Sequence, residues 1–75
     1  MSNATVFGQV VREARKKQRL SQEALAGRCG LHHNAIGLLE RGERTPNLDT
    51  ILAIAKGLDM NASTLIARVE RELDK

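Results

Sequence analysis

The chain has 75 residues, of which 12 are Lys or Arg and 9 are Asp or Glu, and its net charge is +3. A lone domain of this size buries only about 60% of its unfolded surface, so association with a partner is favourable for its stability. The sequence has one cysteine, no apolar run of about 18 residues and no signal-peptide pattern. These features give no support for a membrane span, secretion or a disulfide framework, and they predict a single cytoplasmic domain over residues 1–75.

The positive charge is concentrated in the first part of the chain. Residues 1–45 hold eight basic and four acidic side chains, whereas residues 46–75 hold four and five. Such an asymmetry favours a polyanionic partner, but a small positive excess is also the ordinary state of a solvated surface. The charge therefore points to nucleic acid only in combination with other features.

Apolar residues at helical spacing predict a first helix from Thr5 to Gln18, with Phe7, Val11 and Ala14 facing inward. A basic run follows as far as Arg19. No strand-like alternation of any length occurs, so the fold class expected is all-α.

The segment LSQEALAGRCGLHHNAIGLLERG over residues 20–42 predicts two short helices separated by Gly30. Ser21 is a suitable N-cap for the first, and the second is expected from His32 to Gly42. Gly30 lies where the chain must turn sharply, because a left-handed residue at a helix end is least strained as glycine. The positions expected to bury against a common core are Leu25, Ala26, Cys29, Ile36 and Leu39. This layout is typical of a helix-turn-helix, whose second helix enters the major groove of DNA.

Two further helices complete the chain. Asn47 is expected to cap a fourth helix that is apolar on most sides, and Asn61 opens a fifth at about residues 62–73. The fourth-helix residues expected to be buried are Leu48, Ile51, Leu52, Ile54, Ala55 and Leu58. The sequence thus predicts five helices.

Three segments carry a family resemblance: LSQEALA, ERGERTPNLDT and ILAIAKGL. With them, the chain from about Val6 to Leu65 resembles the Cro/repressor-type helix-turn-helix regulators of phage and bacteria, the XRE family. The resemblance implies a compact five-helix bundle of the lambda-repressor-like DNA-binding type, with the helix-turn-helix at the second and third helices. Arg19 stands where relatives often carry glycine, so a mildly strained backbone is expected there.

Base reading is expected from the exposed start of the third helix, at His33, Asn34, Gly37 and Leu38. Asn34 can pair with adenine through its amide, His33 can donate to a purine N7 or to phosphate, and Leu38 can contact a thymine methyl. The alternative is that these are simply exposed helix residues. Gly37 is unfavourable inside a helix, and close approach of DNA, a dimer contact or neutral drift would each explain it.

The resemblance implies phosphate binding by Gln22 and Arg41, which flank the reading helix, with Arg44 and Thr45 in the following loop and His32 before it as further candidates. It also implies a partly buried ion pair between Arg15 and Glu40 that ties the first helix to the third.

The fifth helix is expected to form a homodimer interface, through Leu65, Ile66, Val69 and Leu73. Val69 and Leu73 carry this expectation because they are predicted to lie past what a five-helix core needs. Such a dimer would place two reading helices about 34 Å apart on a near-palindromic double-stranded DNA operator. The implied function is sequence-specific transcription regulation.

Other classes of function are less well supported. Cys29, His32 and His33 include zinc-ligand types, but a structural zinc site needs four ligands and the chain has no other His or Cys. Cys29 is interpreted as a small inward-facing hydrophobe, with a redox role left open. No nucleophile motif or phosphate-binding glycine loop is present, and no two carboxylates lie at positions predicted to share a cleft, so neither an enzyme nor a cofactor is expected.

Within the resembled family, the short chain is similar to stand-alone regulators: controller proteins of restriction–modification operons, slightly favoured here, small phage repressors, or antitoxins. An antitoxin would bind a toxin protein as well as DNA. A further alternative is a protein-interaction module that keeps the fold without base reading. Contact with RNA polymerase stays open.

Overall fold

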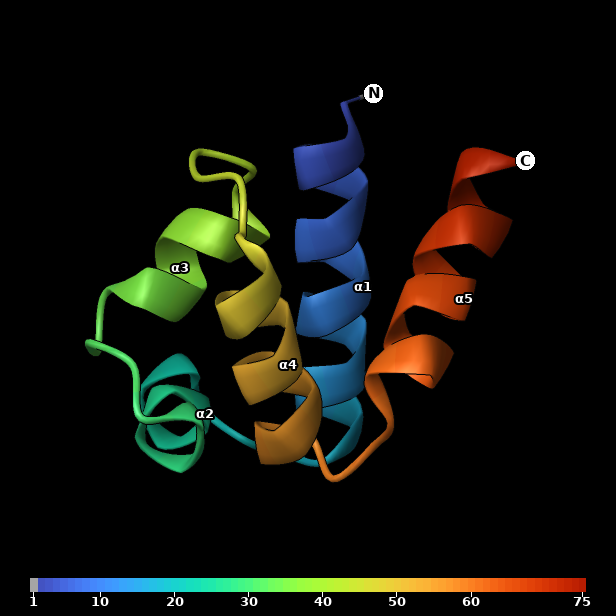
Figure 1. Cartoon of the computed structure of the whole chain (residues 1–75). Coiled ribbons are helices and arrows are strands. Elements are labelled where there is room, and N and C mark those ends of the chain that lie inside the picture. Colours follow the sequence, from blue (N-terminus) through green and yellow to red (C-terminus); the bar gives the residue numbers. More distant parts are fainter. Residues whose placement is uncertain (1) are drawn as a thin grey trace.

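Five helices make up residues 2–75, the part of the chain that the structure describes, and no strand occurs there (Figure 1). They are α1 (Asn3–Lys17), α2 (Gln22–Cys29), α3 (Ala35–Glu40), α4 (Leu48–Gly57) and α5 (Ala62–Leu73). In this computed structural model α1 is central, with α3 and α5 packed on opposite sides of it and α4 in front, against α2 and α5 (Figure 1). The predicted all-α, five-helix fold is confirmed.

Local signals in the sequence set the starts of α2 and α4 and the end of α2 where expected, whereas Asn61 precedes α5 without a side-chain capping hydrogen bond. The Ser21 hydroxyl accepts a hydrogen bond from the Ala24 amide at 2.9 Å, and Asn47 Oδ1 accepts one from the Thr50 amide at 2.8 Å. Gly30 has φ +68°, the left-handed conformation expected of it. Arg19, with φ 58°, adopts the same region without being glycine, so the predicted strain is present.

The core is a single apolar cluster to which every helix contributes. Its fully buried large side chains are Val11, Leu25, Ile36, Leu39, Ile54, Leu58 and Leu65. Two close approaches of helices depend on glycine. A Cβ added at Gly8 would overlap the carbonyl oxygen of Leu39, and one added at Gly57 would overlap Cys29 Sγ. These two glycines therefore set the spacing of α1 to α3 and of α2 to α4.

The third helix is shorter than predicted. It begins at Ala35, so the expected start at His32 is wrong. His32 Nδ1 accepts a hydrogen bond from the Asn34 amide at 3.2 Å, and the His32 carbonyl accepts one from the Ala35 amide at 2.9 Å. These bonds close a turn before the helix, and polar side chains that bond nearby backbone are known to compete with helix in this way. His33 and Asn34 consequently lie in the approach to α3.

Two expectations about burial are also wrong. Leu48 and Leu52 were expected inside, yet they are 69% and 49% exposed. Val69 was expected to lie past the core, yet it is only 7% exposed and belongs to the core cluster, because α5 packs along α1. Leu65 is completely buried as well, so the part of the predicted dimer surface still accessible on α5 is Ile66 and Leu73.

No helix within residues 2–75 has the length and apolar character that crossing a bilayer requires.

Candidate nucleic-acid interface

A buried ion pair joins α1 to the end of α3. Arg15 Nε lies 2.6 Å from Glu40 Oε2, and Arg15 Nη2 donates to Glu40 Oε1 at 3.0 Å. The two side chains are only 10% and 3% exposed. The hydrogen bond to Glu40 raises the pKa of Arg15 above its ordinary value, outweighing burial, which lowers it. The structure thus places these two residues as the resemblance implied.

The same pair fixes the helix-turn-helix at two further points. Arg15 Nη1 donates to the carbonyl oxygen of Leu20 at 2.8 Å, in the turn before α2. Gln22 Nε2 donates to Glu40 Oε1 at 3.1 Å. One carboxylate and one guanidinium therefore connect α1, the first residue of α2 and the last residue of α3. The side chains of the described residues leave no buried polar atom without a hydrogen-bond partner.

The four residues expected to read bases come together beside α3. With Gln22 and Arg41, they line one open hollow of about 270 Å³: His33, Asn34, Gly37 and Leu38. His33 and Asn34 are exposed, and the Asn34 side chain makes no capping hydrogen bond. Leu38 is half-buried at the edge of the hollow, and Gly37 is buried beneath it. We call this feature the Gly37 hollow.

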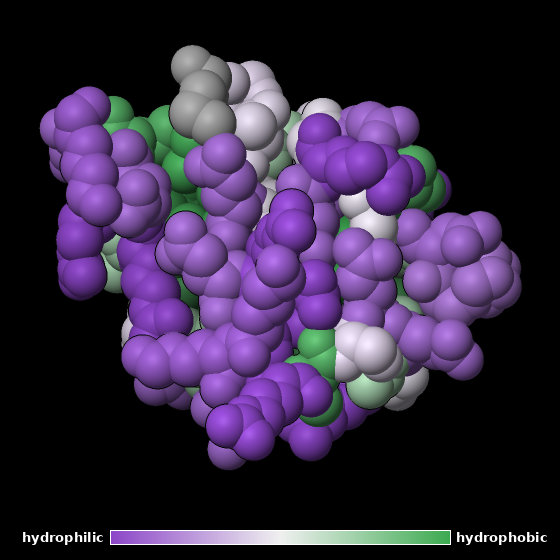
Figure 2. Space-filling view, turned by 180° about the vertical axis from the view of Figure 1, so that it is seen from behind, coloured by the Kyte–Doolittle hydropathy of each residue, from purple (hydrophilic) through white to green (hydrophobic). Residues whose placement is uncertain are grey.

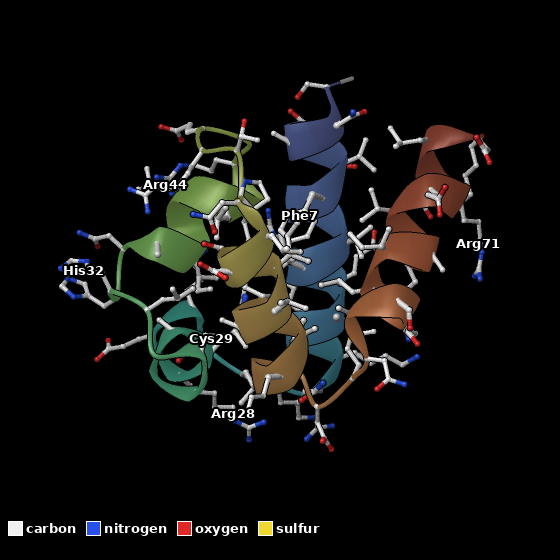
Figure 3. All side chains as sticks on the ribbon, in the orientation of Figure 1. Phe7, Arg28, Cys29, His32, Arg44 and Arg71 are labelled. Atoms are coloured by element: carbon white, nitrogen blue, oxygen red, sulfur yellow. The ribbon has the colours of Figure 1, made fainter. Side chains whose placement is uncertain are left out.

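Of the residues expected to bind phosphate, Gln22 and Arg41 line the hollow, and the others lie before and after α3 in the chain. His32 projects away from the bundle in the turn before α3, and Arg44 lies in the loop after it (Figure 3). The rings of His32 and His33 are stacked with centroids 4.2 Å apart. Thr45 is exposed in the same loop as Arg44. Arg41 is exposed and forms an ion pair with Glu43, whose side chain is also exposed.

Sequence reasoning missed the partner of Arg41. Glu43 is two residues further along the chain, in the turn that follows α3, and the spacing rules for helix side chains do not cover such a pair. The only available signal was an acidic residue beside the basic one in the ERGER segment. The bond holds Arg41 beside the hollow in the free protein, where a phosphate would compete with Glu43 for it.

Cys29 lies in α2 and packs, half-buried, against the core and Gly57 (Figure 3). Burial raises the pKa of its thiol above the ordinary value, outweighing the Gly57 backbone contact, which lowers it, and so disfavours the thiolate. Within the described part of the chain, no three His, Cys, Asp or Glu residues lie close enough together to hold a metal ion. Cys29 thus behaves as a small core side chain.

The fold and this surface define a helix-turn-helix domain: two helices joined by a turn at Gly30, with an open, polar face on the second. A family model described as "Helix-turn-helix" matches residues 11–65. The chain belongs to this helix-turn-helix family, of XRE type, and is a DNA-binding transcriptional regulator.

The names of several similar proteins indicate what those proteins do. The chain is 44% identical over 62 residues to control protein C.BamHI of Bacillus amyloliquefaciens, covering 81% of this chain and 76% of that protein. It is 40% identical over 63 residues to control protein C.SmaI of Serratia marcescens, covering 84% and 75%. The crystal structure of the restriction-modification controller protein C.AhdI from Aeromonas hydrophila superposes with a TM-score of 0.82 at 40% identity, covering 87% and 98%. These relatives are regulators and not enzymes.

The ion pair generates a prediction about stability. Arg15→Ala and Glu40→Ala each leave a buried charge without its partner, which typically lowers the free energy of unfolding by about 3–5 kcal/mol. The joint replacement Arg15→Met with Glu40→Leu removes both charges and is expected to recover most of that loss. Urea or thermal unfolding measures the effect, with Arg44→Ala as an exposed control. Single variants as stable as the parent protein would contradict the structural role of the pair.

Proposed function

We propose that the chain acts as a homodimer on a near-palindromic operator, with α3 as the reading helix, in the role of a restriction–modification controller. The observation that carries the DNA-reading part is the Gly37 hollow, where four candidate reading residues share one open surface between two candidate phosphate ligands. The controller role is supported by the similarity to C.BamHI and C.SmaI.

Three residues of the hollow have chemically distinct roles in the proposed reading of bases. Asn34 reads adenine through its amide, because that group matches the donor and acceptor of adenine in the major groove. His33 donates to a purine N7 or to a phosphate, and Leu38 supplies apolar contact. The proposed phosphate ligands position the helix without reading sequence: Gln22, His32, Arg41, Arg44 and Thr45.

The proposed dimer surface combines α4 with α5. Leu48, Leu52 and Leu73 are exposed large apolar side chains, and Ile66 is half-buried. An apolar depression of about 200 Å³ adjoins Ile66, between the start of α1, α4 and α5. The side of the molecule behind α4 carries mainly hydrophilic side chains (Figure 2). An apolar interface therefore fits the α4 side.

The size of the domain suits such a dimer. It measures 31 × 23 × 23 Å, so two copies side by side span a length of the order needed to place their α3 helices in successive grooves. This is compatible with the spacing of about 34 Å between successive major grooves.

DNA reading is tested by selecting bound duplexes from a random library. An enriched inverted repeat is expected, with affinity that falls steeply as salt rises, because Lys and Arg release counterions from phosphates. Asn34→Ala should weaken binding to the selected site by about 1–3 kcal/mol and relax preference for adenine at one position per half-site. No enriched sequence, with only weak binding, would contradict base reading and leave the domain as a protein-interaction module.

The dimer is tested by sedimentation. Leu48→Asp with Leu52→Asp is expected to give a folded monomer, because both side chains are exposed in the monomer and a buried, unpaired carboxylate opposes association. A charge at Val69 would instead disrupt the core. Gln9→Asp, at an exposed position of α1, is the control. If the double variant still sediments as a dimer, the interface does not include Leu48 and Leu52.

A further inference from the structure

The fold requires glycine at four of the six glycine positions. Gly30 and Gly42 have positive φ, and Gly8 and Gly57 lie where another element leaves no room for a Cβ. The remaining two, Gly27 and Gly37, have helical backbone and no such constraint. Because glycine inside a helix is about 1 kcal/mol less favourable than alanine, both lower the stability of the protein.

The surroundings of these two glycines differ. A Cβ at Gly27 would meet nothing within 4 Å. A Cβ at Gly37 would lie 3.1 Å from Arg41 Nη1 and 3.3 Å from Gln22 Oε1, which are the ends of flexible side chains. No backbone or core atom excludes a methyl group at residue 37. The fold therefore tolerates alanine at residue 37. The missing side chain of Gly37 affects only the shape of the surface that Gln22 and Arg41 cover.

Both covering side chains are held by acidic partners, Gln22 by Glu40 and Arg41 by Glu43. The Glu40 side chain is buried, whereas the Arg41–Glu43 pair is exposed to solvent. A phosphate bound beside α3 would compete with Glu43 for Arg41. With the guanidinium drawn away, the Gly37 backbone would border a shallow gap, with Leu38 at its edge.

We infer that this gap receives the 5-methyl group of a thymine, and that Gly37 thereby sets the base preference of the reading helix. Thymine is the base that presents a methyl group in the major groove. The Gly37 Cα and the Leu38 side chain give that methyl an apolar surface, and an alanine methyl at residue 37 would block its approach. The inference rests on the proposed function, since it requires α3 to enter the major groove.

The test replaces each thymine of the selected operator by uracil, one symmetric position at a time. Uracil lacks only the methyl group. At one position the parent protein is expected to lose about fourfold in affinity per half-site, the factor that corresponds to burying one methyl-sized group. Gly37→Ala is expected to lose this preference or to favour uracil, because its own methyl now fills the gap. Gly27→Ala, the matched control, is expected to keep the parent's preference.

Thermal unfolding accompanies the binding measurements and is expected to show both alanine variants at least as stable as the parent protein. An equal thymine preference in Gly37→Ala and the parent overturns the inference, and so does the absence of any position where uracil weakens binding. If the parent protein selects no operator, the proposed function fails as well. If it selects one and only the Gly37 dependence is missing, the inference alone fails.

Discussion

The position of α3, and with it the proposed reading surface, depends on the ion pair between Arg15 and Glu40. α3 has only six residues, too few to be stable alone, so its position must come from tertiary contacts. Ile36 and Leu39 bury one side of it, and Glu40 joins its last turn to α1 and, through Gln22, to α2. A bidentate, buried pair has one favourable geometry, which a purely apolar contact does not. The orientation of the Gly37 hollow follows from that geometry.

The chain contains features that lower the stability of the isolated domain. Arg19 and Asp59 have left-handed backbone, Gly37 weakens a short helix, and Leu48 and Leu52 are exposed to solvent. In the proposed dimer a second copy covers the two leucines and so stabilises them, and the proposed role of Gly37 is realised only on DNA. A small domain of this kind is expected to be most stable as the dimer on its operator, since binding to the folded form shifts the unfolding equilibrium.

Helix caps and turns could be predicted from the sequence, whereas the packing of one helix against another could be predicted only in part. Ser21, Asn47 and Gly30 act on their own neighbours, so their roles followed directly from residue type. The start of α3 could not be predicted in this way. The His32 ring accepts a hydrogen bond from the Asn34 amide in a turn, and the spacing of apolar residues gives no sign of that bond. Helical spacing grouped Leu48 with buried residues and placed Val69 on an apolar face assigned to a dimer, since spacing defines a face but not which neighbour covers it. The Arg15–Glu40 contact was expected from family resemblance alone, because 25 residues separate the pair.

A crystal structure of the protein with its selected operator tests the central claim most directly. The account predicts two protomers in contact through α4 and α5, each with α3 in the major groove, Asn34 within hydrogen-bond distance of an adenine, and the Arg15–Glu40 pair intact. DNA bound on another face, or α3 outside the groove with the Gly37 hollow open to solvent, would contradict it.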